Sequence, residues 1–201
     1  MLFNSIVFFK FLLVVFSIWL ITPARYRWMI LLAASLLFYA WEKPIYLLLL
    51  VSSISVAYVS ALKMEEYKKQ MDRKKLYLYA ALFFNLGVLI IFKYLGFFTE
   101  LLSTTAALFS SDLNFEPLKL FLPVGISFYT FQSIGYSLDV FYGIRKPEKH
   151  FGYFALFVSF FPQILSGPIG RSAELFPQIH KQHYFLWENF SYGTQRFTWG
   201  L

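Results

Sequence analysis

The sequence predicts an all-α membrane protein, a polytopic helix bundle that contains one reentrant segment broken by proline and glycine. The composition is 58% hydrophobic and only 14% charged, with a mean hydropathy of +0.57. That leaves too little polar surface to cover a soluble domain of 201 residues. Several apolar runs approach the roughly 20 residues that cross a bilayer. One further apolar stretch contains prolines and glycines, which an uninterrupted spanning helix should not contain.

The candidate membrane spans lie at 3–21, 28–41, 45–62, 76–95 and 122–142. The first is not a removable signal peptide, because Lys10 lies inside the run and no small-residue cleavage site follows it. The second is short, and Trp28 and Trp41 flank it as aromatic residues do at a membrane interface. A further helix is expected at 187–201, where the chain ends without a polar tail. We therefore expect residues 1–201 to form one incomplete membrane domain.

Basic residues alternate between rich and poor loops, which predicts the orientation of the bundle. They cluster after the first, third and fifth apolar runs: Arg25, Arg27, Lys63, Lys68, Lys69, Arg73, Lys74, Lys75, Arg145, Lys146 and Lys149. By the positive-inside rule these loops face the cytoplasm, and the N-terminus is outside. The net charge of +7 then reflects topology rather than a nucleic-acid site, because acidic residues interrupt the largest cluster.

The segment 151–171 is predicted to be broken and reentrant. Proline and glycine at membrane depth leave backbone carbonyls and amides without helical partners, and hydrocarbon cannot satisfy them. Such a segment has to lie inside protein or beside water, so we expect it to line an internal cavity within a larger bundle. The predicted lining residues here are Pro162, Gln163, Gly167, Pro168 and Arg171. Arg171 either holds an anionic or carbonyl group of a ligand or ties down carbonyls that the turn leaves free.

The run 122–142 carries polar residues at helical spacing. Ser127, Gln132 and Asp139 are predicted to brace the cavity or line it. The alternative is close helix packing, because small hydroxyl residues and glycine let neighbouring helices approach and form hydrogen bonds. An ionisable group inside a span usually faces a partner or water, and Arg145 and Arg171 are the candidate partners of Asp139. Asp139 also lies close enough to the basic loop to sit at the cytoplasmic interface.

The sequence contains no recognisable catalytic or metal motif. Neither a G-x-S-x-G elbow, a phosphate-binding glycine loop nor an H-E-x-x-H pattern occurs. His180 and His183 are three residues apart, but no cysteine or acidic residue completes a metal set at ligand spacing. These histidines and His150 are predicted to be surface residues. We assign no catalytic residue, no metal and no bound cofactor.

A resemblance to a known family rests on ordered blocks along nearly the whole chain. The main ones are PVGISFYTFQSIGYSLDVFYG, FALFVSFFPQILSGPIGR and ELFPQI, preceded by MLFNSIVFFKFLL, LLAASLLFYAWEKPIYLLLL and FKYLGFF. Together they resemble the membrane-bound O-acyltransferase (MBOAT) family, in particular its bacterial branch, which acetylates exported polysaccharides such as alginate, and related peptidoglycan O-acetyltransferases. Each block alone is weak, but their order is specific.

This resemblance implies an enzyme of the bacterial inner membrane that crosses it several times, with reentrant pieces around a substrate funnel that the broken segment would line. It would transfer an acyl group, acetyl in this branch, to hydroxyls of a cell-surface polysaccharide. The implied donor is acetyl-CoA or another activated acyl group. Implied partners are membrane lipid, the polysaccharide acceptor, a periplasmic or extracellular acetyltransferase and a C-terminal half with the essential histidine. None of this chain's histidines matches that histidine's motif, so residues 1–201 alone are predicted to be inactive.

Two other hypotheses stay open at this point. The chain could be a non-catalytic membrane subunit or scaffold of a polysaccharide acetylation complex. It could instead be a small transporter-like protein that uses the broken segment as a gate, although the sequence shows no inverted repeat of the kind that many transporters have.

Overall fold

The computed structural model describes residues 5–41, 43–109, 123, 125–164, 172–181 and 185–200. Within these ranges every regular element is a helix, so the all-α prediction is confirmed. The elements are α1 (Ile6–Ile21), the 3-10 helix η1 (Ala24–Tyr26), α2 (Arg27–Ala40), α3 (Tyr46–Glu66), α4 (Met71–Phe109), α5 (Ile126–Phe141), α6 (Phe151–Ser159), α7 (Phe161–Ile164), α8 (Ser172–His180) and α9 (Trp187–Gly200).

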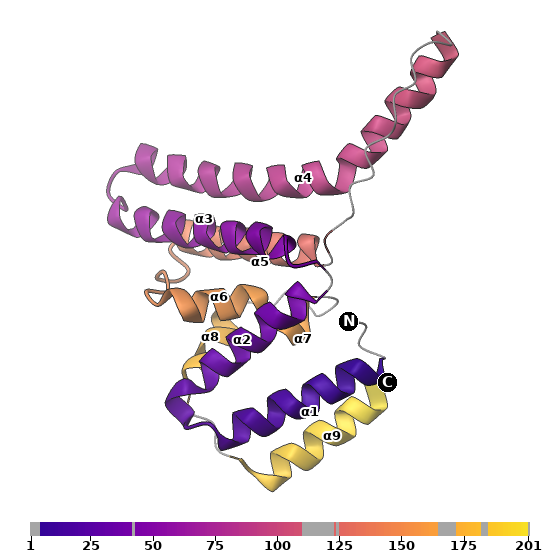
Figure 1. Cartoon of the computed structure of the whole chain (residues 1–201). Coiled ribbons are helices and arrows are strands. Elements are labelled where there is room, and N and C mark those ends of the chain that lie inside the picture. Colours follow the sequence, from indigo (N-terminus) through magenta and orange to yellow (C-terminus); the bar gives the residue numbers. More distant parts are fainter. Residues whose placement is uncertain are drawn as a thin grey trace.

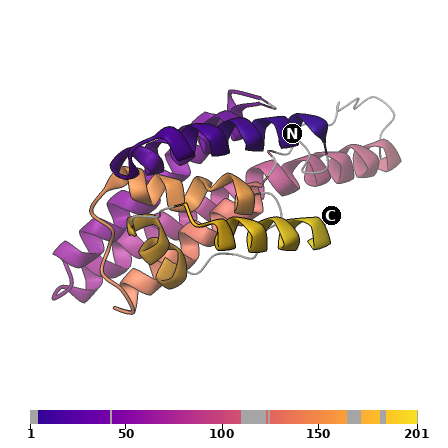
Figure 2. The ribbon, with the colours of Figure 1, turned by 90° about the horizontal axis from the view of Figure 1, so that it is seen from below.

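The helices stack in layers (Figure 1). α4 lies on one outer side and packs on α3 and α5, which also contact each other. α6 and α2 form the next layer, with α7 and α8 beside them. α1 and α9 lie on the opposite outer side, where the rings of Phe16 and Phe190 stack at 5.7 Å. Both views show the C-terminal part of α4 extending beyond the other helices (Figure 2).

Two described helical stretches are long and apolar enough to cross a membrane, Tyr46–Glu66 and Met71–Thr99. Ile6–Ile21 and Phe151–Ile164 are apolar but shorter. Large apolar side chains on the outer side of α4 are exposed, and Phe83 retains 79% of its accessible surface. An apolar surface of this kind suits contact with lipid, which agrees with the membrane class that the composition predicts.

The end of α4 differs from the sequence-based expectation. The predicted span covers 76–95, but the helix begins at Met71 and continues to Phe109. Residues 96–109 contain leucine and alanine and no proline, so nothing in the local sequence stops the helix. A serine or threonine there need not end it, because its hydroxyl can bond back to the preceding turn. The Thr99 hydroxyl does so, donating to the Gly96 carbonyl at 2.9 Å.

Small residues allow α3 to pack closely on its neighbours. Ala57 and Ala61 are fully buried, and so is Ser53, whose hydroxyl donates to Asn85 Oδ1 on α4. The Asn85 amide in turn donates to the Ala81 carbonyl at 2.9 Å. Small side chains and interhelical hydrogen bonds are the usual means of joining membrane helices, because lipid tails are as apolar as leucine.

The three basic loops lie at the same end of the bundle (Figure 1). Lys74 lies at the start of α4, and its Nζ is 5.1 Å from the centroid of the Phe141 ring. Trp28, at the start of α2, meets Tyr153 of α6 with ring centroids 5.0 Å apart. The positive-inside rule requires the basic loops to lie at one end of the bundle, as they do here. The direction of this end relative to the membrane stays a prediction.

Candidate functional site

The candidate site is built around a break between α6 and α7, within the predicted broken segment. α6 ends at Ser159, and Phe160 has φ −52° and ψ 108°, outside the helical region. In a continuous helix the amide of Phe161 would donate to the carbonyl of Phe157. Here the Phe161 amide donates to the Ser35 hydroxyl of α2 at 3.2 Å. The Phe157 carbonyl accepts from Gln132 Nε2 of α5 at 2.8 Å. The two backbone groups separated by the break are thus each satisfied by a side chain of a different helix.

Pro162 explains why the helix breaks at this point. In a continuous helix its ring would collide with the carbonyl of Val158, and it has no N–H to donate there. After the break, Pro162 is the second residue of α7, a position where a missing N–H costs nothing. Phe161 anchors the new turn, since it is buried and its ring lies 5.4 Å from Phe11 and 5.7 Å from Phe38.

The remaining predicted residues of the broken segment fall into two groups. Pro162 is exposed and Gln163 half-buried. Gln163 Oε1 is itself buried and has no hydrogen-bond partner among the described residues, so it is able to accept a hydrogen bond from a further group. Gly167, Pro168 and Arg171 lie outside the described residues, and their predicted roles stay predictions.

Polar residues of α5 face protein. Thr130, Ser133 and Ser137 are buried, as is Gln132, whereas Ser127 is half-buried. The Ser137 hydroxyl donates to the carbonyl of Ser133 at 2.8 Å, and α5 packs on both α3 and α4. This burial agrees with close helix packing, but the buried hydroxyls of Thr130 and Ser133 have no hydrogen-bond partner among the described residues, so lining a cavity stays the alternative. Gln132 differs, because its amide braces the break.

Asp139 has a neutral partner instead of the arginine that the sequence suggested. Its Oδ2 accepts a hydrogen bond from the Ser172 hydroxyl, the first residue of α8, at 2.7 Å. Arg145 approaches it only through the backbone, as its amide donates to the Asp139 carbonyl at 3.4 Å. The guanidinium of Arg145 instead lies over the ring of Phe176, 4.4 Å from the centroid. Of the two candidate partners, Arg145 therefore does not pair with the Asp139 carboxylate in this structure. Arg171, the other candidate, lies outside the described residues.

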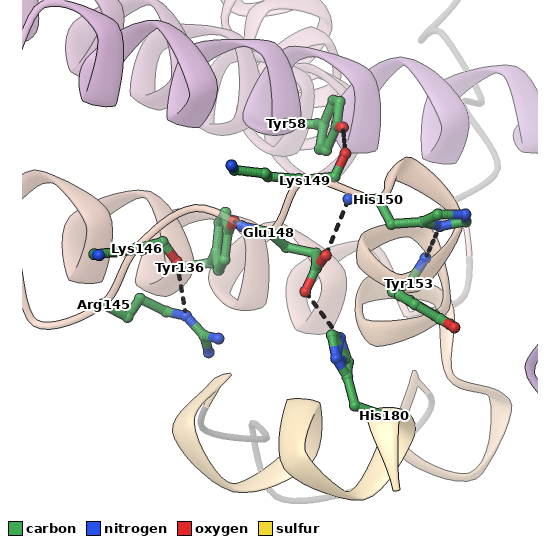
Figure 3. A network of polar contacts seen from close by, with 9 residues as sticks. All are labelled: Tyr58, Tyr136, Arg145, Lys146, Glu148, Lys149, His150, Tyr153 and His180. Atoms are coloured by element: carbon green, nitrogen blue, oxygen red, sulfur yellow. Dashed lines mark hydrogen bonds and ion pairs between the residues drawn. The ribbon is translucent and has the colours of Figure 1, made fainter. Parts of the chain in front are cut away.

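A polar network that the sequence did not predict holds the loop between α5 and α6 (Figure 3). Glu148 is its centre, with a side chain only 11% exposed. Its Oε2 lies 2.9 Å from His180 Nε2 on α8, and its Oε1 accepts the His150 amide at 2.9 Å. Its own amide donates to the Tyr136 hydroxyl at 2.7 Å. The Tyr58 hydroxyl of α3 donates to the Lys149 carbonyl.

Sequence reasoning placed the histidines on the surface and considered only a metal for His180. Glu148 lies 32 positions earlier in the chain, so no local spacing could have paired the two. In the part of the chain that the structure describes, no three histidine, aspartate or glutamate side chains form a metal site. His183 lies outside it. His150 caps the start of α6, where its Nδ1 accepts the Tyr153 amide at 3.4 Å.

Replacing Glu148 with alanine is expected to loosen this loop. The change removes two hydrogen-bonded partners from a mostly buried position, which costs about 1 to 3 kcal/mol. Limited trypsin digestion should therefore cut faster after Arg145 and Lys149. Glu65→Ala is the matched control, because Glu65 forms an exposed ion pair with Lys68 that contributes at most about 1 kcal/mol. Equal cleavage rates in the Glu148 variant and the unmodified protein would contradict this role.

The curated proteins that this chain is similar to are named alginate O-acetylases and a peptidoglycan O-acetyltransferase. The Probable alginate O-acetylase AlgI of Azotobacter vinelandii is 33% identical over 202 residues, 100% of this chain and 40% of the relative. The same-named protein of Pseudomonas aeruginosa is 34% identical over 202 residues, 100% of this chain and 38% of the relative. The Peptidoglycan O-acetyltransferase of Helicobacter pylori is 36% identical over 200 residues, 87% of this chain and 36% of the relative. No family model and no solved structure matches.

The relationship inferred from the sequence blocks is therefore confirmed. The chain is homologous to the N-terminal part of these MBOAT-family proteins. It spans about two fifths of the length of the curated relatives it matches. The relationship and the two long apolar helices together indicate a membrane protein.

Proposed function

We propose that the protein containing this chain is an O-acyltransferase of the bacterial inner membrane, which it crosses several times with its N-terminus outside. It transfers an acetyl group from acetyl-CoA or another activated acyl donor to hydroxyls of an exported cell-surface polysaccharide. The observation that carries this proposal is the relationship to two kinds of polysaccharide O-acetyltransferase, each at 33% identity or more.

In this proposal the described helices shape the site, and the base lies elsewhere. The attacking hydroxyl adds to the acyl carbonyl, the bond to the donor breaks, and a general base takes the hydroxyl's proton. Among the described residues, His150 and His180 are exposed, and the mostly buried Glu148 carboxylate is paired with His180. We assign the base to a histidine in the C-terminal part that completes the bundle.

The break between α6 and α7 supports the placement of the funnel. It contributes Gln163, whose buried Oε1 is unpaired among the described residues, beside Pro162. It is braced by Gln132, while Asp139 fixes the start of α8. Surrounding protein at such a site keeps water from the acyl group, which limits hydrolysis. Ser127, Gly167, Pro168 and Arg171 complete the proposed lining. A periplasmic or extracellular acetyltransferase is the proposed partner protein that assists acetylation of the exported polysaccharide.

Acetyl ester content of the purified cell-surface polysaccharide tests the proposal. Deletion of the gene is expected to reduce alkali-labile acetate to background, and the full-length gene should restore it. Residues 1–201 expressed alone should not restore it, because they lack the proposed base. Unchanged acetylation after deletion would overturn the acyltransferase proposal. Restoration by residues 1–201 alone would overturn the assignment of the base to the C-terminal part.

A further inference from the structure

A cavity of about 340 Å³ opens at the basic end of the bundle, between the start of α2, α6 and α8. Its inner wall is aromatic and aliphatic, with Trp28 of α2, Tyr153 of α6 and Leu175 of α8 among the lining residues. Three cationic residues also line it, Arg25, Arg27 and Lys181, and no aspartate or glutamate is among the described lining residues. His180 lines it as well and is paired with Glu148. The cavity therefore combines an apolar interior with three cationic side chains.

The three cations differ in how firmly they are held. Arg27 Nε donates to the Thr22 carbonyl at 3.0 Å, and its guanidinium lies 4.2 Å from the centroid of the Trp19 ring. Its charge is thus fixed at the C-terminal end of α1. Arg25 and Lys181 are exposed, and neither forms an ion pair within the described ranges. An anion bound here would contact the fixed charge of Arg27 and the exposed charges of Arg25 and Lys181.

An apolar groove of about 240 Å³ shares two wall residues, Trp19 and Leu31, with this cavity. Its other walls are Leu12, Val15 and Phe16 of α1 and Phe161 of α7. Along α1 the groove runs from Trp19 back to Leu12, seven residues or about 10 Å at the helical rise of 1.5 Å per residue. The cationic cavity and the groove together accommodate a ligand with an anionic head and an apolar chain.

The depth of the cavity agrees with a membrane interface. Trp19 and Trp28 flank the connection between α1 and α2, and tryptophan is enriched at the level of lipid headgroups. Basic pockets between membrane helices on the cytoplasmic side bind anionic headgroups. The groove leads from this level toward the middle of α1, the direction in which a lipid acyl chain would run.

We propose that the Arg25, Arg27 and Lys181 cavity binds the phosphate of an anionic membrane phospholipid, whose acyl chain lies in the groove along α1. A phospholipid explains both halves of the site. An acetyl group has two carbons and cannot fill a groove about 10 Å long, and free phosphate has no apolar part. The lipid site does not depend on the acetyl-transfer proposal, because its three cationic residues are not assigned to the funnel, although Phe160 and Phe161 beside the break contribute to its walls.

Lipid binding to the delipidated full-length protein tests this site, measured by native mass spectrometry with phosphatidylglycerol and, separately, phosphatidylcholine. The Arg25→Gln/Lys181→Gln variant removes two charges, each contributing about 1 kcal/mol near the headgroup level, so phosphatidylglycerol binding should weaken about 10- to 30-fold. Arg73→Gln/Lys75→Gln is the control, because it removes two exposed charges from another basic loop. Leu12→Trp should also weaken binding by filling the groove.

Competition separates the possible ligands. Inorganic phosphate and coenzyme A, each at millimolar concentration, are expected to leave phosphatidylglycerol bound. Displacement by either would assign the cavity to a soluble phosphate ligand and overturn the lipid proposal. Equal affinity for phosphatidylcholine, or equal weakening in the control variant, would also overturn it. So would absence of any bound lipid, the result expected if another part of the protein covers the groove. Unchanged melting temperatures of the variants ensure that a loss of binding is local.

Discussion

Replacing Gly125 with alanine is expected to lower the free energy of unfolding by about 2 to 5 kcal/mol. Gly125 precedes α5 with φ 77°, in the left-handed region, where a side chain costs about 1 to 2 kcal/mol. A Cβ there would also lie 2.5 Å from the Ile164 carbonyl oxygen of α7. Relieving that overlap means moving backbone, which adds about 1 to 3 kcal/mol by comparison with overpacked cores. The apparent melting temperature of the purified protein in detergent measures the effect.

Gly87→Ala provides the control for this prediction. Gly87 lies within α4, and a Cβ there has no other atom within 4 Å apart from the local helix and chain neighbours. Alanine favours a helix over glycine by up to about 1 kcal/mol, so this variant should be as stable as the unmodified protein or more stable. If the Gly125→Ala variant had the same melting temperature as the Gly87→Ala variant, the close approach of Gly125 to Ile164 of α7 would be contradicted.

Replacing Gln132 with leucine is expected to destabilise the protein by about 1 to 3 kcal/mol, because the Phe157 carbonyl loses its donor inside the protein. The helix cannot simply close again, since Pro162 opposes a continuous turn. If the broken segment lines the funnel, polysaccharide acetylation should fall as well. Both melting temperature and acetyl ester content are to be measured in the full-length protein.

Gln195→Leu is the matched substitution, because Gln195 is exposed on α9. It should change the melting temperature little. Ser35→Ala tests the other side of the break, where the Phe161 amide would lose its acceptor. A Gln132→Leu variant with normal stability and normal acetylation would show that the Phe157 carbonyl needs no partner from α5.

The sequence alone predicted that this is a membrane protein and that the helix in segment 151–171 is broken. Composition predicts the membrane helices, and Pro162 predicts that no continuous helix passes through this segment. The exact residue of the break was not predictable, because it depends on side chains far away in sequence. Ser35 precedes Phe161 by 126 positions, and Gln132 precedes Phe157 by 25.

The same limit applies to charged residues. Asp139 was recognised as unusual, but its contact with the Ser172 hydroxyl depends on how α8 returns to α5. Charge alone suggested Arg145, whose guanidinium stacks on Phe176 instead. The pairing of Glu148 with His180 likewise follows from the packing of α8 on α6. Local periodicity identifies residues on one helix face, whereas these contacts join different helices.

The central claim is that the backbone groups separated by the break at Phe160 are satisfied by side chains of other helices. An experimental structure of the full-length protein in a lipid nanodisc tests it most directly. We predict a helix that ends at Ser159, with the Phe157 carbonyl on Gln132 and the Phe161 amide on Ser35, surrounded by other helices. A continuous helix through 151–171 in contact with lipid acyl chains would contradict the account.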